Sequence, residues 1–540
     1  EFLKRGYLDL LSEFVHPKWR IHRANGCSAM ILWDHDSQWF TRPAKAVDVP
    51  DRYQNLERPG IVPDRIQPAV LQLYGKLDDG YLYSSFDHPG TPTRIGEAIL
   101  RWNQPFCAFL GGKSGDFSEK SHIRYPGDLL EKSCVLLNDT RRDGVVKGRL
   151  TLSGTDWSQE FSVPVAAGER KDVPIRLRLP DTLKPGRHEL RAEFTFESRD
   201  LSFGAKPQHF VQNDTLPIHL LPRPEKPDSD LLVFDPAGKT TRELKRLNLP
   251  FRPIGKRELA DGSFLRNLAR PEKTVLVIGR EALDDMSVHL PTDAALRNGL
   301  TILVMEQSAK GLTRLGFRVN EIGLREVFPV PAAHPLLRGL NADLLKNWRG
   351  ESTLTAPYFD GYRKRIPLTL WNGFQNQRVW RNRNRGVTAS VLIEKPERGN
   401  FLPVLAGGFD LQYTPLLQWR SGNGSILFCQ MDLSGRTEND PAADRLFLNL
   451  LSPVASRASS PGKVFYSGNP EGAGLLRELG HSASPWTGKV ENGKPAILVL
   501  GSGFDPAIRP DELRKQGIDV VTFGLSAEES NRALGKADAF

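Results

Sequence analysis

The sequence predicts a multidomain protein of mixed α/β and β class, in which α/β units are joined to a β-sandwich and to the end of a (β/α)8 barrel. Three observations lead to this prediction. A helical pattern followed by a short strand opens the chain. Short β-type runs separated by turns fill residues 99–222, and buried strands alternate with helices from residue 231 onward. The 540 residues leave room for roughly three to four domains of ordinary size.

The first residues predict the C-terminal end of a barrel over residues 1–47. Residues 2–20 carry apolar groups at helical spacing, and the apolar run 29–32 has the length of a strand. A helix that leads into a single strand is typical of the last part of a barrel rather than of the start of a domain. The chain is therefore expected to be an interior fragment of a longer protein, with both of its ends cut.

Aromatic and acidic residues follow the strand predicted at 29–32, namely Trp33, Asp34, Asp36 and Trp39. Aromatic rings stack on the C–H faces of sugars, and carboxylates accept hydrogen bonds from their hydroxyls. Active sites lie at the C-terminal rim of such barrels, which favours a saccharide site. A second interpretation stays open, in which the two tryptophans close the barrel end and Asp34 caps a turn.

Residues 48–98 are rich in proline, glycine and charge, and they predict a long irregular connection. Residues 99–222 predict an antiparallel, Ig-like β-sandwich of roughly seven strands. The six clearest strand-like runs are 106–110, 129–138, 148–153, 159–163, 172–179 and 189–196. A proline-rich linker follows the sandwich.

Residues 228–457 predict a flavodoxin-like α/β domain, with an insertion at 330–395. Its strands are expected at 231–235, 274–279, 300–306, 401–406 and 424–432, and its helices at 240–249 and 440–451. Asn439 or Asp440 is expected to cap the second helix. Residues 461–540 repeat the same order of elements, which predicts a second, incomplete copy of the unit.

The α/β units are predicted to be non-catalytic. A thiol nucleophile would have to stand on the turn after the second strand, but that turn holds Gly279-Arg280 in one copy and Gly501-Ser502 in the other. Cys429 lies inside a strand, and Gly501-Ser502-Gly503 is a weak phosphate-binding signal without the full glycine motif. Arg436, Glu438 and Asp440 are expected to serve as loop and cap residues.

Composition narrows the set of partners. The net charge of +9 is spread along the chain, so nucleic acid is a less favoured partner, and no apolar run is long enough for a membrane span. The densest basic patch, Arg378–Arg385, is expected to pack on a neighbouring domain, with polyanion binding as the alternative. No histidine or cysteine spacing predicts a metal site, and no cofactor is expected. The sequence leaves undecided whether Cys107 and Cys134 form a disulfide.

The order of these units resembles that of multidomain glycoside hydrolases of the β-galactosidase type. Gly26 to Trp39 resembles the last barrel strand, and His334 to Leu340 with Trp348 to Glu351 resembles the amidotransferase-like domain, which is normally inert. The sandwich resemblance rests on Trp102-Asn103-Gln104-Pro105, Asp116-Phe117, His122, Tyr125-Pro126-Gly127-Asp128, Glu131-Lys132 and Leu137-Asn138-Asp139-Thr140.

The resemblance implies a retaining hydrolase of β-linked saccharides that uses two carboxylates. Glu1 is the one residue that could match the nucleophile, and the acid/base glutamate lies on a barrel strand outside this chain, so the isolated fragment is expected to be inactive. An oligo- or polysaccharide is the expected partner, which points to a secreted or periplasmic protein. The alternative is a non-catalytic carbohydrate-binding or assembly module, in which the α/β units make contacts in a homo-oligomer.

Overall fold

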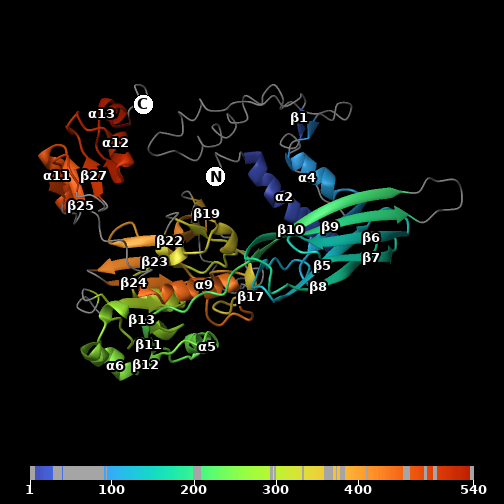
Figure 1. Cartoon of the computed structure of the whole chain (residues 1–540), viewed down its shortest axis with the longest axis horizontal. Coiled ribbons are helices and arrows are strands. Elements are labelled where there is room, and N and C mark those ends of the chain that lie inside the picture. The colour runs from blue at the N-terminus through green and yellow to red at the C-terminus, as the bar shows by residue number, and fades with distance from the viewer. Residues whose placement is uncertain are drawn as a thin grey trace.

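The computed structural model confirms a mixed α/β chain that is rich in β-sheet (Figure 1). It describes residues 7–27, 39–40, 91–92, 94–198, 208–291, 296, 299–330, 334–357, 369–371, 374–376, 384–408, 411–421, 424–453, 463–478, 483–490 and 496–534. No helix within these ranges is both long and apolar enough to cross a membrane.

Two of the described helices precede the sandwich and pack on it. Helix α2 (Tyr7–Ala24) lies along helix α4 (Arg94–Trp102), and both cover one face of the sheet that contains β3 (Phe106–Gly111) and β5 (Leu129–Asn138). The strand predicted at 29–32 lies outside the described residues, so the barrel end stays a prediction. Further along, β1 (Trp39–Phe40) pairs with β2 (Thr91–Pro92).

Helix α4 begins inside the segment 48–98, for which an irregular connection is predicted. That prediction is therefore wrong for residues 94–98. Ile95, Ala98, Ile99 and Trp102 stand at helical spacing and are all buried. The stretch is one short amphipathic helix between a proline-rich segment and a strand, which explains why its pattern is easily missed.

The sandwich consists of two sheets packed face to face. One has the order β4-β10-β9-β6-β7 and the other the order β3-β5-β8. Their remaining strands are β4 (Ile123–Arg124), β6 (Gly144–Leu152), β7 (Ser158–Val165), β8 (Arg170–Arg178), β9 (Gly186–Ser198) and β10 (His209–Leu220). Inward-facing side chains from both sheets form one core, where the rings of Phe106 and Phe196 stack 5.0 Å apart.

The α/β domain is built on one large sheet. Five parallel strands stand in the order β12-β11-β13-β14-β24, and antiparallel β23, β21 and β15 continue the sheet, with β22 and β16 joined to β23. The parallel strands are β12 (Arg252–Pro253), β11 (Asp230–Phe234), β13 (Thr274–Ile278), β14 (Thr301–Val304) and β24 (Gly424–Cys429). The antiparallel ones are β23 (Tyr413–Ser421), β21 (Leu392–Glu394), β15 (Val319–Asn320), β22 (Phe401–Gly407) and β16 (Phe328–Pro329).

Helices cover both faces of this sheet. Leu244 of α5 (Lys239–Arg246) and Phe447 of α9 (Pro441–Leu450) pack on one face, whereas Leu259 of α6 (Lys256–Asp261) and Leu312 of α8 (Ala309–Arg314) pack on the other. Short 3-10 turns at Ser263–Asn267, Pro271–Lys273 and Ala282–Asp284 join these elements. The predicted cap is confirmed at Asp440, whose carboxylate accepts a hydrogen bond from the Ala442 N–H (2.9 Å).

The predicted insertion at 330–395 is wrong in part, because much of it belongs to the domain core. Trp348 and Leu392 are buried in the same cluster as the parallel strands, and β21 is a strand of the main sheet. The other elements of this stretch are 3-10 turns Pro335–Leu337 and Ala342–Leu344, strands β17 (Trp348–Glu351) and β20 (Arg385–Gly386), which pair, and the hairpin of β18 (Thr369–Trp371) and β19 (Phe374–Asn376).

A second parallel sheet follows, with the order β26-β25-β27-β28. This order repeats β12-β11-β13-β14, which agrees with the repeat expected from the sequence. Its strands are β25 (Lys463–Ser467), β26 (Ser484–Pro485), β27 (Ala496–Leu500) and β28 (Ile518–Thr522), and its helices are α11 (Pro470–Glu478), α12 (Pro510–Lys515) and α13 (Ala527–Leu534).

The cysteines are free thiols. Cys134 points into the sandwich core and Cys107 into the cluster beneath α2 and α4, so the two side chains lie on opposite faces of their sheet. The disulfide that the sequence left open therefore does not form.

Candidate functional site

The predicted saccharide site falls almost wholly outside the described residues. Glu1, Trp33, Asp34 and Asp36 lie there, and of Trp39 only the backbone is described, as part of β1. Their roles stay predictions. Within the described ranges, no group of three His, Cys, Asp or Glu side chains could hold a metal ion.

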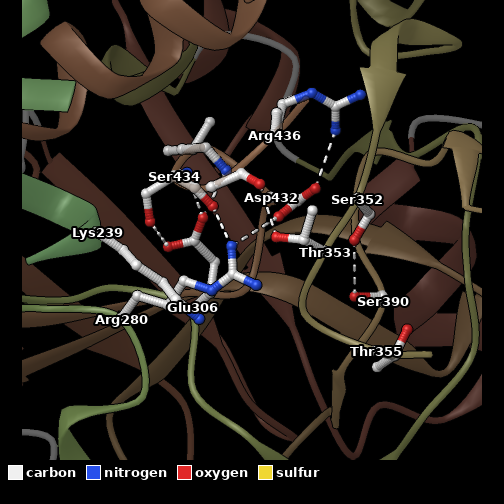
Figure 2. A network of polar contacts seen from close by, with 12 residues as sticks. Lys239, Arg280, Glu306, Ser352, Thr353, Thr355, Ser390, Asp432, Ser434 and Arg436 are labelled. Carbon is white, nitrogen blue, oxygen red and sulfur yellow. Dashed lines mark hydrogen bonds and ion pairs between the residues drawn. The ribbon is translucent and has the colours of Figure 1, made fainter. Parts of the chain in front are cut away.

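A buried network of charged side chains occupies the C-terminal edge of the α/β sheet (Figure 2). Arg280 follows β13, Glu306 follows β14, and Asp432 follows β24. All three side chains are fully buried. The strand order places the switch point between β11 and β13, and ligands of doubly wound sheets bind at such a point beyond the carboxyl ends of the strands.

Arg280 extends its side chain from the end of β13 toward the loop that follows β24. Its backbone N–H donates to the Thr240 hydroxyl (2.9 Å), and its Nη1 donates to the Ser434 carbonyl and lies 3.8 Å from Asp432 Oδ1. Gly435 has a left-handed backbone (φ 78°), and a Cβ there would lie 2.1 Å from Arg280 Nη1, so a glycine is needed to seat the guanidinium.

Glu306 holds the loop that follows β24. Its Oε1 accepts hydrogen bonds from the backbone N–H groups of Leu433 and Ser434, each at 2.6 Å, and its Oε2 accepts one from the Ser434 hydroxyl (2.8 Å). Burial raises the pKa of Glu306 to about 7, against the opposing attraction of Arg280. The carboxyl therefore fixes the loop rather than facing an open cleft.

Asp432 links the two arginines of the network. Its Oδ2 lies 3.1 Å from Nη1 of Arg436, and burial raises the pKa of this aspartate. Arg436 also donates to the carbonyls of Val387 (2.6 Å) and Arg349 (2.7 Å), which ties β24 to β17. Arg436 and Asp440 thus serve as loop and cap residues, as predicted.

The geometry of this edge favours a structural role. The charged side chains of the network contact one another or the loop after β24, and Gly279 stands so close to Asp235 that a Cβ at position 279 would lie 2.4 Å from the aspartate Oδ1. Cys429 is fully buried, and burial raises its thiol pKa well above the usual value, so this thiol is not activated as a nucleophile. The inertness of the α/β domain stays a prediction.

Several of the sequence motifs behind the resemblance meet at the interface of the sandwich and the α/β domain. Asp128 Oδ2 lies 3.2 Å from Nη2 of Arg349, and the Tyr125 hydroxyl donates to Asp444 (3.3 Å). Arg385 pairs with Asp116, so the described end of the basic patch contacts a neighbouring domain, as expected. These motifs therefore hold two domains together.

A cavity of about 880 Å³ lies among α2, α4, the sandwich and residues 343–347. The Arg20 guanidinium stands 4.7 Å from the Trp102 ring centroid and 3.3 Å from Asp214, whose carboxylate also accepts the Leu110 N–H (2.8 Å). Burial lowers the pKa of Arg20, against the attraction of Asp214. Because these charges already have partners, they join α2 to the sandwich rather than offering open chemistry.

The network residues Arg280, Glu306 and Asp432 are not among the residues predicted from the sequence. One signal could have found them, because each follows a buried parallel strand within three residues, at the sheet edge where polar groups collect. Arg280 and Glu306 contact Ser434 across 154 and 128 positions of the sequence, which no local pattern reveals.

Comparisons with known proteins give no family for the chain. No family model and no curated protein matches it. Solved structures match parts of it: a CARDB domain from Pyrococcus furiosus solved with two metal ions (13% identity, 22% of this chain and 87% of that chain, TM-score 0.15), a family 123 glycoside hydrolase from Clostridium perfringens (12%, 32% and 38%, 0.14) and an activated α2-macroglobulin from Escherichia coli (20%, 23% and 10%, 0.16). At these TM-scores the likenesses support no conclusion about fold or function.

Proposed function

We propose that this chain forms the C-terminal part of a retaining glycoside hydrolase of the β-galactosidase type, acting on β-linked saccharides. In this proposal residues 1–47 end a (β/α)8 barrel, the sandwich is Ig-like, and the two parallel sheets are copies of an amidotransferase-like unit. Glu1 acts as the nucleophile, while Trp33, Asp34, Asp36 and Trp39 line the sugar subsite. The acid/base glutamate comes from an earlier barrel strand.

The observation that supports the proposal most is the joint between the sandwich and the α/β domain. The residues that carry the resemblance, among them Asp116, Tyr125, Asp128 and Arg349, contact one another or their neighbours across this joint. Helix α2 is held by Trp19, whose ring N–H donates to Asn103 (2.8 Å) in the turn between α4 and β3. Such a rigid assembly suits accessory domains that brace a barrel.

The buried charged network of Arg280, Glu306 and Asp432 favours separate roles for the α/β units and for the start of the chain. Chemistry is assigned to the residues near the start of the chain, and the α/β units serve as structural or subunit-contact domains. The same observation is compatible with the alternative, a non-catalytic carbohydrate-binding or assembly module. The hydrolase and the binding module differ in catalytic turnover, because a binding module would bind saccharides without cleaving them.

Saccharide binding through the two tryptophans can be tested directly. Trp33→Ala and Trp39→Ala are each expected to weaken oligosaccharide binding about tenfold, because each removes an aromatic stacking face. Calorimetric titration of a panel of β-linked oligosaccharides would measure this change. Trp157→Ala, on the loop between β6 and β7, is the matched control. Equal affinity in all three variants would contradict the assignment of the sugar subsite.

A further inference from the structure

Basic groups gather on one wall of the cavity of about 880 Å³ beside α2. This basic wall consists of sandwich residues and one residue before β17, namely Lys120, His122, Arg187, His219 and Lys346. We infer that the basic wall binds the carboxylate of an acidic sugar. The choice of a sugar rests on the proposed function, whereas the choice of an anion follows from the charges of the cavity.

The basic wall lies where the sandwich and the α/β domain meet. His122 stands directly before β4, and His219 lies in β10, which pairs with β4. Their rings meet edge to face, with centroids 5.3 Å apart. The His122 ring is buried, and its Nε2 lies 2.8 Å from the carbonyl oxygen of Asp343 in the α/β domain. Contacts on both sides therefore hold the two imidazoles in place.

The carboxylates that line the cavity already have basic partners. Each lies within 3.5 Å of a basic nitrogen, in the pairs Asp214–Arg20, Asp214–Arg101, Glu119–Lys132 and Asp343–Lys346. The lining holds five Lys and Arg side chains against three Asp and Glu side chains. The ion pairs therefore leave positive charge over, and a ligand that neutralises it has to be an anion.

Lys120, Arg187 and His219 carry the groups that are available to such a ligand. Among the described residues, the Lys120 ammonium makes no ion pair or hydrogen bond, and the ring nitrogens of His219 make no hydrogen bond. The Arg187 side chain is 64% exposed and lies 3.8 Å from Glu189, which pairs more closely with Arg191 (2.8 Å). A carboxylate would thus find charged donors on Lys120 and Arg187.

The half-buried ring of His219 senses the positive charge of the wall. Its pKa is lowered to about 4, first by burial and then by His122, Arg187 and Lys346, against the attraction of Asp343. A bound anion would oppose these cations and raise the pKa of His219, because it favours the charged imidazolium. The titration of this histidine therefore reports whether the wall is occupied.

The rest of the cavity suits the neutral part of a sugar. Its volume lies in the range of small-molecule sites. Ser118 and Asn347 line it with a hydroxyl and an amide, which can exchange hydrogen bonds with sugar hydroxyls. Pro17 and Pro217 add apolar surface. The ligand that fits these groups is a sugar with one carboxylate.

Nitrogen NMR of the histidines in the whole chain tests this inference, with His219→Gln to assign the resonance. D-glucuronate should raise the pKa of His219 and bind with a Kd of about 1 mM or tighter, whereas D-glucose should do neither. Lys120→Gln should weaken glucuronate binding at least about tenfold. Lys147→Gln removes the same charge from the exposed side of β6 and is the matched control, which should bind as the unaltered protein does.

The outcomes separate this inference from the proposed function. Inorganic sulfate that binds where glucuronate does not would show an adventitious ion only and would overturn the inference. Equal affinity in Lys120→Gln and Lys147→Gln would also overturn it, because the carboxylate would then bind elsewhere. Glucuronate binding without hydrolysis of aryl β-glycosides would leave the acidic-sugar site standing and remove the hydrolase. Hydrolysis without glucuronate binding would remove this inference alone.

Discussion

Asp432→Ala is expected to lower the free energy of unfolding of the α/β domain by about 3–5 kcal/mol, because removal of one partner leaves buried charge without compensation. Asp432 is fully buried, and it stands between Arg436 at 3.1 Å and Arg280 at 3.8 Å. Both guanidinium groups are nearly or completely inaccessible to water. Without the carboxylate, Arg280 keeps the half-buried Glu281 at 3.5 Å and the attraction of Glu306, whereas Arg436 loses the carboxylate it pairs with.

Urea unfolding followed by circular dichroism would measure this loss. Asp228→Ala is the matched control, since Asp228 forms a surface ion pair with Lys273 and is 83% exposed, and its removal should hardly move the midpoint. A change below about 1 kcal/mol for Asp432→Ala would show that the network does not hold the sheet edge together.

Glu119→Gln is expected to destabilise the sandwich by about 3–5 kcal/mol, because it leaves the ammonium of Lys132 buried without its counter-charge. Lys132 lies in β5 and is 1% exposed. Its Nζ donates to Glu119 Oε2 (2.9 Å) and to the Ser121 carbonyl (2.6 Å). Burial lowers the pKa of Lys132, and the lysine in turn holds the pKa of Glu119 below its usual value, against the cost of burying that carboxylate.

The double variant Glu119→Gln, Lys132→Met provides the control for this prediction. Replacing both members of a buried ion pair by uncharged groups of similar size is often neutral, so much of the lost stability should return. Thermal unfolding of the single and double variants would show the difference. If the double variant were as unstable as Glu119→Gln, the loss would come from packing and not from the unpaired ammonium.

The sequence predicts those parts of the fold that depend on local patterns. Strand β5 is observed at the predicted residues, 129–138, because the continuous apolar run Cys134–Leu137 and the flanking turns define it. Local sequence patterns likewise predict the cap of α9 at Asp440 and the repeated strand order of the second sheet. Strand β10 was not predicted, since it alternates only weakly and contains Pro217.

The parts that could not be predicted depend on contacts between distant residues. Trp348 looks like part of an insertion, yet its ring is buried in the same core cluster as Leu231 and Leu427. Arg280, Glu306 and Asp432 converge only because the parallel sheet brings three strand ends to one edge. Periodicity locates strands, but it does not say which strand ends become neighbours.

The buried network at the sheet edge and the contacts between the sandwich and the α/β domain have one feature in common. Both use charged residues that would otherwise be taken for chemistry, and both give those residues partners within the described chain. The proposed function accordingly assigns saccharide chemistry to the aromatic and acidic residues near the start of the chain. Glu1 and Glu306 are therefore the two carboxylates whose roles are most worth separating.

Hydrolysis of aryl β-glycosides by the native-length protein that carries this chain tests the central claim most directly. Glu1→Gln is expected to lower kcat/KM by about a thousandfold or more, because it removes the proposed nucleophile. Glu306→Gln should keep kcat/KM within about tenfold of the unaltered protein wherever it remains folded by circular dichroism. Full activity in Glu1→Gln, with activity lost in a folded Glu306→Gln variant, would contradict the account and place the chemistry at the α/β edge.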